Sequence, residues 1–290
     1  AHVFEVVDST ISGSQAVFTG EVSEGAATVV TVYPAEAAGG MDGDNVVVTV
    51  PDEQQIDTTN VASGAIVTVG KATAGSPVAF KNVCGLLAVE VSYENIRRIV
   101  IEGTDVAGSV KVNPVTGEIV AVTAGAGRIT VTPSGEPFKK GVYYVPVLPG
   151  TTAADSFKVS MVRDGGFSSE KSATVEVVIP RNGGFSFGKL DSQLSWSLHI
   201  TNKAELDAWN ATKSYSTDVV YLDADIDYAS GSWTPKALAG TFDGQNHRIY
   251  NFVCQPNGTQ MTDRYMSGFF ATLTNGSVLK DLVLGSSDGV

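Results

Sequence analysis

Residues 240–252 read GTFDGQNHRIYNF, and the interpretation of this stretch decides the fold of the C-terminal part of the chain. It places Asp243 and His247 four positions apart, with Gly244 between them. An acid and a base could form a catalytic corner, but such a pair also needs a nucleophile within hydrogen-bond reach, and the neighbouring sequence implies none. We therefore predict a glycine-containing turn that leads into a short strand at Ile249.

A repeated apolar pattern around this turn predicts stacked strands. Residues 249–253 (IYNFV) and 279–283 (LKDLV) both have apolar residues at their first, fourth and fifth positions, and they are offset by 30 residues. The run VVYL at residues 219–222 lies a similar distance upstream. A strand that recurs at a period of about 20 to 50 residues is typical of stacked-rung architectures. We expect residues 189–290 to form the start of a parallel β-helix.

One segment of this region has the signature of a helix. In the sequence NKAELDAWN at residues 202–210, an asparagine can cap the first turn and Glu205 completes a capping box. Leu206 and Trp209 lie three positions apart and would share one face. We predict a short helix near residues 202–211 that covers the open end of the β-helix.

The first 188 residues carry a different pattern, in which short strands alternate with turns. Runs such as NVVVTV (residues 45–50) and GVYYVPV (residues 141–147) are rich in Val and Tyr. Their period-two alternation and short connections predict antiparallel sheets with one solvated face, arranged as one or two β-sandwiches.

Two breaker-rich stretches suggest where the domains divide. The sequence KATAGSP at residues 71–77 favours a boundary at 76/77, and RNGGFSFG at residues 181–188 reads as a glycine-rich hinge. We therefore expect a first sandwich over residues 1–76, which could be incomplete at its N-terminus, and a second over residues 77–188. The β-helix domain would follow over residues 189–290.

Composition excludes several classes of function. The net charge of −12 disfavours electrostatic binding to nucleic acid or to an anionic membrane, but it is compatible with calcium or a neutral glycan. No apolar run reaches the length of a membrane-spanning helix. Cys84 and Cys254 lie in different expected domains, and we predict buried free thiols. His2 and His199 are isolated and lack metal-ligand spacing.

Residues 196–290 resemble the right-handed β-helix of bacterial surface proteins, of which GLUG-repeat proteins are one version. The resemblance is carried by DADID at residues 223–227, WTP at 233–235, GTFDGQNHRI at 240–249 and GFF at 268–270. In that family the matching phrase is a turn at a rung corner. The resemblance implies that Phe242 fills the interior, that Gly244 allows the tight reversal and that Ile249 opens the next strand.

Residues 20–188 resemble, more loosely, the fimbrillin-like adhesins of Gram-negative anaerobes. The carriers are VTVYP at residues 30–34, FKNVCGLLAV at 80–89 and YYVPV at 143–147. The resemblance implies two transthyretin-like β-sandwiches and a role in cell adhesion or fimbriae, with other pilus subunits among the partners. It also implies export through a lipoprotein signal that is later removed, and an extracellular location anchored at the outer membrane.

Two sets of side chains are candidates for binding. Aromatic rings can stack on sugars, but in a solenoid they also plug an end or fill the core; the candidates are Trp196, Trp209 and Trp233. Alternating carboxylates on one strand face could hold calcium, or they could form a solvated face or cap the next turn; these are Asp223, Asp225 and Asp227.

The favoured interpretation is a non-enzymatic cell-surface adhesin that binds host or microbial glycans, matrix proteins or other cells. It needs no cofactor, with calcium as the one ion its acidic strand could take. The alternative is a calcium-dependent polysaccharide-degrading β-helix enzyme. A catalytic β-helix needs a long groove built over many rungs, and the repeat found here supplies fewer than three.

Overall fold

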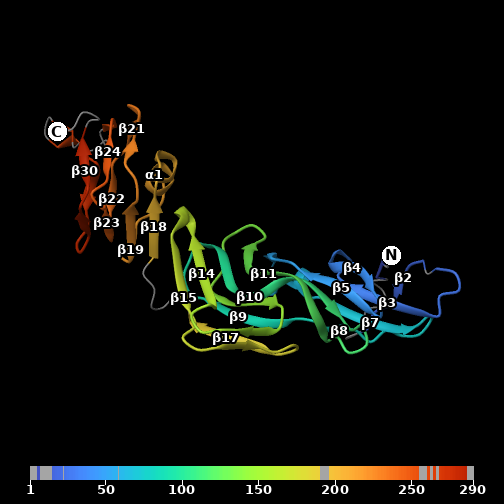
Figure 1. The fold of residues 1–290 in the computed structure, drawn as a ribbon. Helices are drawn as coiled ribbons and strands as arrows, with labels where there is room; N and C mark the ends of the chain where they lie inside the picture. Colours follow the sequence, from blue (N-terminus) through green and yellow to red (C-terminus); the bar gives the residue numbers. More distant parts are fainter. Residues whose placement is uncertain are drawn as a thin grey trace.

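The residues that the structure describes are all-β apart from one α-helix and short 3-10 turns, which confirms the expected all-β class with β-sandwiches. The computed structural model describes residues 5–6, 15–21, 23–57, 59–189, 196–254, 260–261, 264–265 and 268–285. Figure 1 shows an elongated body, with the N-terminal strands at one end, a second group of sheets in the middle and the C-terminal strands at the other end.

The N-terminal part is a β-sandwich of two antiparallel sheets. Its first sheet contains β3 (Thr28–Tyr33), β7 (Thr68–Thr73) and β8 (Lys81–Asn82). The facing sheet contains β4 (Ala38–Asp42), β5 (Asn45–Val50) and parts of β10 (Ile96–Val112) and β11 (Ile119–Pro133). Every second residue of β5 is buried, so its valines supply one side of a shared apolar core. A short pair, β1 (Glu5–Val6) and β2 (Phe18–Thr19), precedes this sandwich in the chain.

The middle part is a second sandwich. One sheet contains β9 (Gly85–Val91), β12 (Gly141–Val147) and β17 (Gly184–Lys189). The facing sheet contains the other halves of β10 and β11 with β6 (Glu53–Ile56), β14 (Lys158–Arg163) and β15 (Ser168–Ser172). A further pair joins β13 (Gly150–Thr152) to β16 (Val177–Ile179).

The long hairpin β10–β11 runs through both sandwiches. Near its tip, residues 108–112 of β10 pair with β5 of the first sandwich. Near its base, Ile101 pairs with Ile129, and both side chains lie in the core of the second sandwich. An irregularity in the pairing between Glu102 and Ala107 separates the two halves.

The strand pairing does not follow the boundary predicted at residues 76/77. Strands β7 and β8 lie on either side of that position and pair with each other. Strand β6 precedes the boundary in sequence but pairs with β11 in the second sandwich. The stretch 71–77 is therefore the end of one strand and a turn within a sheet, and each sandwich is assembled from segments distant in sequence.

The glycine-rich hinge predicted at residues 181–188 is also wrong, because most of this segment is strand β17. It pairs in parallel with β9, with Phe185 opposite Leu87. The rings of Phe157 and Phe187 stack at 5.8 Å and those of Phe157 and Phe185 lie 6.3 Å apart. The alternating phenylalanines therefore place the segment in a sheet despite its glycines.

In the C-terminal part, the described residues between 196 and 285 form successive turns of chain that mostly stack in parallel, and we call this part the solenoid region. Four stacks of strands pair in parallel within it. The first contains β18 (Trp196–Ile200), β19 (Asp218–Leu222), β23 (Thr241–Asp243) and β29 (Val278–Lys280). The second contains β20 (Ile226–Asp227), β24 (Arg248–Tyr250) and β30 (Val283–Gly285). The others pair β21 (Ser232–Trp233) with β25 (Val253–Cys254), and β22 (Lys236–Leu238) with β28 (Phe270–Leu273).

The repeat of 30 residues predicted from the sequence does not match the observed pairing. Phe242 pairs with Val220, 22 positions upstream, and with Leu279, 37 positions downstream. Ile249 belongs to the neighbouring stack, where it pairs with Leu284. The longer separation arises because the chain between β25 and β28 includes an antiparallel pair of strands, β26 (Gln260–Met261) and β27 (Arg264–Tyr265). The right hand of the predicted β-helix and its relation to GLUG repeats stay predictions.

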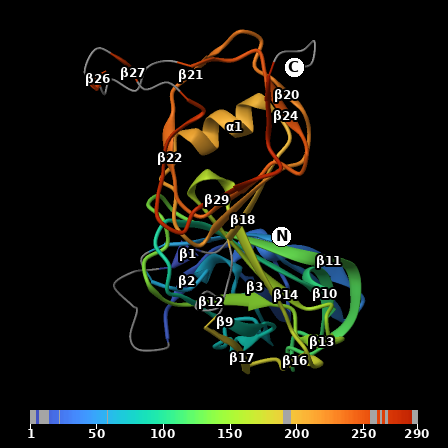
Figure 2. The same cartoon turned by 90° about the vertical axis from the view of Figure 1, so that its left-hand side faces the viewer.

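The predicted helix is present as α1 (Lys203–Asn210). The Asn202 side chain accepts a hydrogen bond from the Glu205 backbone N–H at 3.0 Å, and the Glu205 carboxylate accepts one from the Thr201 N–H at 2.7 Å. Leu206 and Trp209 are the buried residues of the helix, as their spacing predicts. Figure 2, which looks along the solenoid region, shows α1 framed by its strands.

The second sandwich and the solenoid region share one sheet and one core. The sheet path runs from β6 and β11 through β14 and β15 to β18 and on to β29, and the step between the two parts is the antiparallel pairing of Ser168 with Ser197. A single cluster of buried apolar residues extends from Leu87 in the second sandwich to Ile249 in the solenoid region. The two parts therefore form a continuous body.

Candidate functional site

The stretch at residues 240–252 is a turn between stacked strands, as predicted. Asp243 pairs with Lys280 at 2.7 Å and accepts a hydrogen bond from the Gln245 backbone N–H at 3.0 Å. The His247 ring contacts a different carboxylate, Asp225, at 3.1 Å. Asp243 and His247 thus serve separate structural contacts, and Phe242 between the strands is fully buried.

Gly244 is required by the stacking rather than by the reversal of the chain. A Cβ atom at this position would lie 2.4 Å from the Asp281 carbonyl oxygen and 2.5 Å from the Leu282 Cα atom. The residues that adopt positive φ angles in this turn are Gln245 and Asn246. The next turn of chain therefore approaches Gly244 at backbone distance.

The predicted alternation is present, with Leu222 and Ile226 buried and the three aspartates exposed. The prediction of one continuous strand is wrong, because β19 ends at Leu222 and β20 begins at Ile226, so Asp223 and Asp225 lie in the connection between two stacks. We call residues 223–227 the acidic segment. Each carboxylate has its own partners in the chain. These partners are His199 and Gln245 for Asp223, His247 and the Arg248 N–H for Asp225, and the Ala229 N–H and Asn251 for Asp227. Most of these contacts join successive turns of the solenoid region. The aspartates therefore stabilise the stacking of these turns.

The structure does not gather these aspartates into a metal centre. Within the part of the chain that the structure describes, no group of three or more His, Cys, Asp or Glu side chains is placed to hold a metal ion. The turn-capping interpretation fits Asp227, whose carboxylate accepts a hydrogen bond from the Ala229 N–H at 2.8 Å. His199, which we described as isolated, contacts Asp223 at 2.7 Å.

The three tryptophans fill the core instead of offering exposed faces. Trp196, Trp209 and Trp233 are exposed by 1% or less. The Trp233 ring stacks on Phe269 with centroids 4.3 Å apart, and its indole N–H donates to the Phe269 carbonyl oxygen. Trp209 packs 5.2 Å from Phe242. Stacking of a sugar needs an exposed ring face, so the core-filling alternative describes all three residues.

The cysteines are free, as predicted. Cys84 is buried in the first sandwich, and this burial raises the pKa of its thiol to about 11. Cys254 is only half-buried, in contrast to the prediction. His2, which the sequence predicted to be isolated, lies outside the described residues.

The junction between the second sandwich and the solenoid region contains a buried ion pair. Arg163, at the end of β14, donates through Nη2 to Asp218, which begins β19, and both side chains are exposed by 3% or less. The guanidinium lies 4.5 Å from the Phe167 ring centroid, 5.1 Å from Trp196 and 4.7 Å from Tyr215. These aromatic faces surround the cation in a region that excludes water.

Two titratable groups at this junction have shifted pKa values because they are desolvated. Burial raises the pKa of Asp218, and the hydrogen bond from Arg163 opposes this effect. Burial also lowers the pKa of Lys236 to about 8, although the Asp218 charge acts in the other direction. The Lys236 ammonium donates to the carbonyl oxygens of Trp209 at 2.8 Å and Thr212 at 2.7 Å. It therefore caps the C-terminal end of α1.

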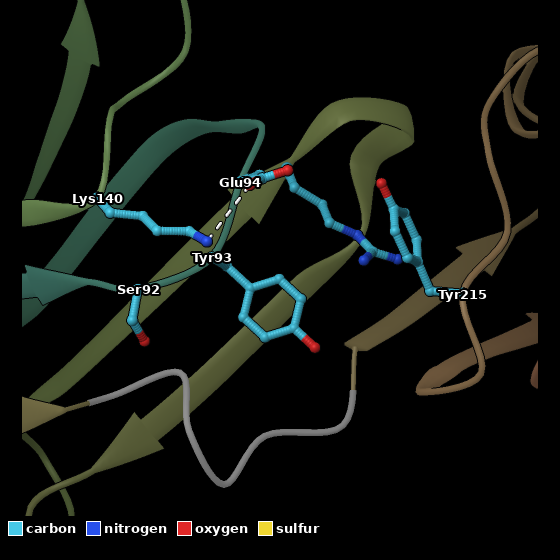
Figure 3. Close-up of a pocket in the computed structure, with 6 residues that line it drawn as sticks. Ser92, Tyr93, Glu94, Lys140 and Tyr215 are labelled. Atoms are coloured by element: carbon cyan, nitrogen blue, oxygen red, sulfur yellow. Dashed lines mark ion pairs between the residues drawn. The ribbon is translucent and has the colours of Figure 1, made fainter.

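A cleft opens beside this ion pair, and we call it the junction cleft. Its volume is about 280 Å³. Figure 3 shows Tyr93 extending from the sandwich side toward Tyr215 of the solenoid region, with the Lys140–Glu94 ion pair nearby. The six lining residues are Ser92, Tyr93, Glu94, Lys140, Arg163 and Tyr215.

The junction cleft combines fixed aromatic walls with polar groups. Tyr93 is half-buried and packs on Trp196 at 5.3 Å. Lys140 and Glu94 form an exposed ion pair at 3.3 Å. A second guanidinium nitrogen of Arg163, Nη1, is buried and has no hydrogen-bond partner among the described residues. Such a combination of apolar surface and a few convergent polar groups is typical of a small-molecule site.

Sequence analysis did not identify this cleft. Its residues come from four separate segments, three in the second sandwich and one, with Tyr215, in the solenoid region. No local motif joins them. The one signal in the sequence was the excess of apolar and aromatic residues next to Asp218, and this signal does not distinguish a core from a cleft.

No protein-family model and no curated protein matches the chain. A solved structure of a candidate cell adhesion protein from Bacteroides ovatus is similar with a TM-score of 0.38 and 11% identity, over 58% of this chain and 64% of that one. A second candidate cell adhesion protein, from Bacteroides thetaiotaomicron, has a TM-score of 0.29 and 15% identity, over 64% of this chain and 75% of that one. This chain thus covers less than two thirds of the first protein, and at these values the likeness establishes neither family nor function.

Proposed function

We propose that the chain is a non-enzymatic adhesin of a bacterial cell surface, which binds glycans, matrix proteins or other cells. The observation that supports this proposal most is the continuous body described above, in which one sheet and one core join the second sandwich to the solenoid region. Such a body can hold a binding surface at a distance from its attachment point and transmit a pulling force through the shared sheet and core.

The proposal also covers the cellular location, the membrane anchor and the partners of the protein. The protein would stand outside the cell, anchored at the outer membrane through a lipoprotein group, either alone or with other pilus subunits. Among the described residues, no helix is long and apolar enough to span a membrane. The net charge of −12 is unfavourable for binding nucleic acid, which supports an uncharged or cationic partner.

A retention-and-release assay tests this function. Purified protein is applied to immobilised mucin glycans, plant and microbial polysaccharides and matrix proteins, with and without calcium, and both bound protein and released oligosaccharide are measured. We expect retention on at least one surface without release of oligosaccharide.

Two outcomes would contradict the proposal. Absence of retention on every surface would overturn adhesion. Calcium-dependent release that is lost in Asp225→Ala would support the enzymatic alternative, since Asp225 is one of the exposed aspartates of the acidic segment.

A further inference from the structure

We propose that the junction cleft binds one neutral pyranose ring, such as the terminal sugar of a glycan. This inference rests on the proposed adhesive function and names its ligand class and its site. The junction cleft is formed by both the second sandwich and the solenoid region, so the site exists only where the two parts are joined.

The size of the cleft favours a single ring. Sites for drug-sized ligands have volumes of about 300 to 1,000 Å³. The junction cleft, at about 280 Å³, lies just below this range. An open cleft of this size can seat one sugar ring, while the rest of a glycan would remain in solvent.

The aromatic residues of the cleft are held in place before any ligand binds. Tyr93 packs on the buried Trp196. Tyr215 contacts two cations, with the Arg163 guanidinium 4.7 Å and the Lys213 ammonium 5.1 Å from its ring centroid. Tyr215 is thus a fixed wall, and Tyr93 offers a half-buried ring on which the C–H face of a pyranose can stack. Fixed contact groups lose little conformational entropy on binding.

The charge balance of the cleft favours a neutral ligand over an ion. The lining contains two cations, Arg163 and Lys140, and one anion, Glu94. Asp218 lies behind Arg163 and neutralises it. An anionic sugar would meet the Glu94 carboxylate, and a cationic ligand would meet Lys140.

The exposed ion pair suits the hydroxyl groups of a sugar. An ammonium group can only donate hydrogen bonds and a carboxylate can only accept them, whereas a hydroxyl does both. Adjacent hydroxyls of one ring can therefore bind Lys140 and Glu94, whose charged atoms are 3.3 Å apart.

A titration followed by NMR of the full chain tests the inference. The probes are the methyl glycosides of glucose, galactose, mannose and N-acetylglucosamine, with glucuronate as the charged comparison. We expect at least one neutral glycoside to give saturable shifts at the cleft residues, with a Kd of roughly millimolar size for so small a ligand. Glucuronate should bind more weakly.

Two variants and their controls locate the site. Tyr93→Ala should weaken binding about tenfold through loss of the stacking surface. The surface variant Lys140→Met with Glu94→Gln should also weaken binding, and it leaves the buried core intact. Tyr144→Ala removes another exposed tyrosine of the second sandwich, and Lys158→Met with Glu170→Gln removes another exposed pair at 3.3 Å. Both controls should bind like the wild type.

The outcomes separate this inference from the proposed function. If the wild type is retained on glycan surfaces but the cleft variants are retained equally well, the cleft is not the site and the adhesive function stands. If every glycoside fails to shift the cleft residues, or glucuronate binds best, the ligand class is wrong. If the wild type is retained on no surface, the function and the inference both fail.

Discussion

At the scale of single residues, the junction is organised by charges that are removed from water. Arg163 and Asp218 neutralise each other among aromatic rings, and Lys236 donates to backbone carbonyl oxygens at the end of α1. Removing one partner of a buried ion pair leaves an uncompensated charge, which is strongly destabilising. These residues therefore matter more for the junction than the exposed ion pairs elsewhere on the body.

The pKa of Lys236 gives a prediction for the pH dependence of stability. Because burial lowers its pKa from 10.5 to about 8, the folded state binds fewer protons than the unfolded state between these two pH values. The free energy of unfolding should therefore rise with pH across this window, by roughly 1 to 2 kcal/mol after allowance for the partial exposure of Lys236. Denaturant unfolding gives the free energy of unfolding of the wild type and of Lys236→Met at pH 7.5 and at pH 10.5. The wild type should gain more stability than Lys236→Met between these two pH values, and that extra gain is the contribution of Lys236.

The control for this measurement is Lys81→Met, which changes an exposed lysine of the first sandwich. The free energies of unfolding of Lys81→Met and the wild type should differ by the same amount at both pH values. The desolvation of Lys236 would be refuted if the wild type and Lys236→Met also differed in free energy of unfolding by the same amount at both pH values. It would equally be refuted if the wild type gained less stability with rising pH than Lys236→Met.

At the scale of elements, the solenoid region depends on close approach between successive turns of the chain. Gly244 is the position where this approach is tightest against backbone atoms of the following turn, the Asp281 carbonyl oxygen and the Leu282 Cα atom. Carboxylates of the acidic segment add contacts between turns through Asp223 and Asp225. The stack is thus specified by a small residue on the inside and by polar contacts on the outside.

Gly244→Ala should destabilise this region, because its Cβ atom would displace the backbone of the next turn. The expected loss is about 1 to 3 kcal/mol, as for other overpacked sites. Gly64→Ala is the matched control, since its Cβ atom would meet no atom within 4 Å. Thermal unfolding should show a lower Tm for Gly244→Ala and nearly the wild-type value for Gly64→Ala. Equal Tm values for the two variants would show that the turns do not stack at this distance.

The sequence predicted the type of element well where the signal was local. Alternating valines predicted β5, and the cap at Asn202 predicted α1. It also predicted a turn at residues 240–252, because neither Asp243 nor His247 had a nucleophile beside it. The buried state of the tryptophans was one of two interpretations that the sequence left open.

The errors arose where pairing is non-local. Glycines at residues 181–188 suggested a hinge, but the phenylalanine alternation and the partner strand β9 decide the structure. The repeat of 30 residues matched apolar positions in strands of two different stacks, because the inserted pair β26–β27 changes the spacing. The junction cleft depends on the pairing of Ser168 with Ser197, which no local pattern encodes.

At the scale of the whole molecule, the parts are joined in two different ways. The hairpin β10–β11 contributes strands to both sandwiches, so neither sandwich is complete without it. The second sandwich and the solenoid region instead share a sheet edge, a core and the Arg163–Asp218 pair. Both arrangements oppose bending of the long axis seen in Figure 1.

The central claim is that this elongated body is continuous across the junction, and small-angle X-ray scattering of the full chain in solution tests it most directly. We expect the wild-type scattering curve to agree with the elongated shape in Figure 1 as a single conformation. Arg163→Met, which leaves Asp218 buried without its partner, should broaden the distribution of dimensions. A wild-type curve that requires an ensemble of bent shapes, unchanged in Arg163→Met, would contradict a rigid junction and the adhesive function that is built on it.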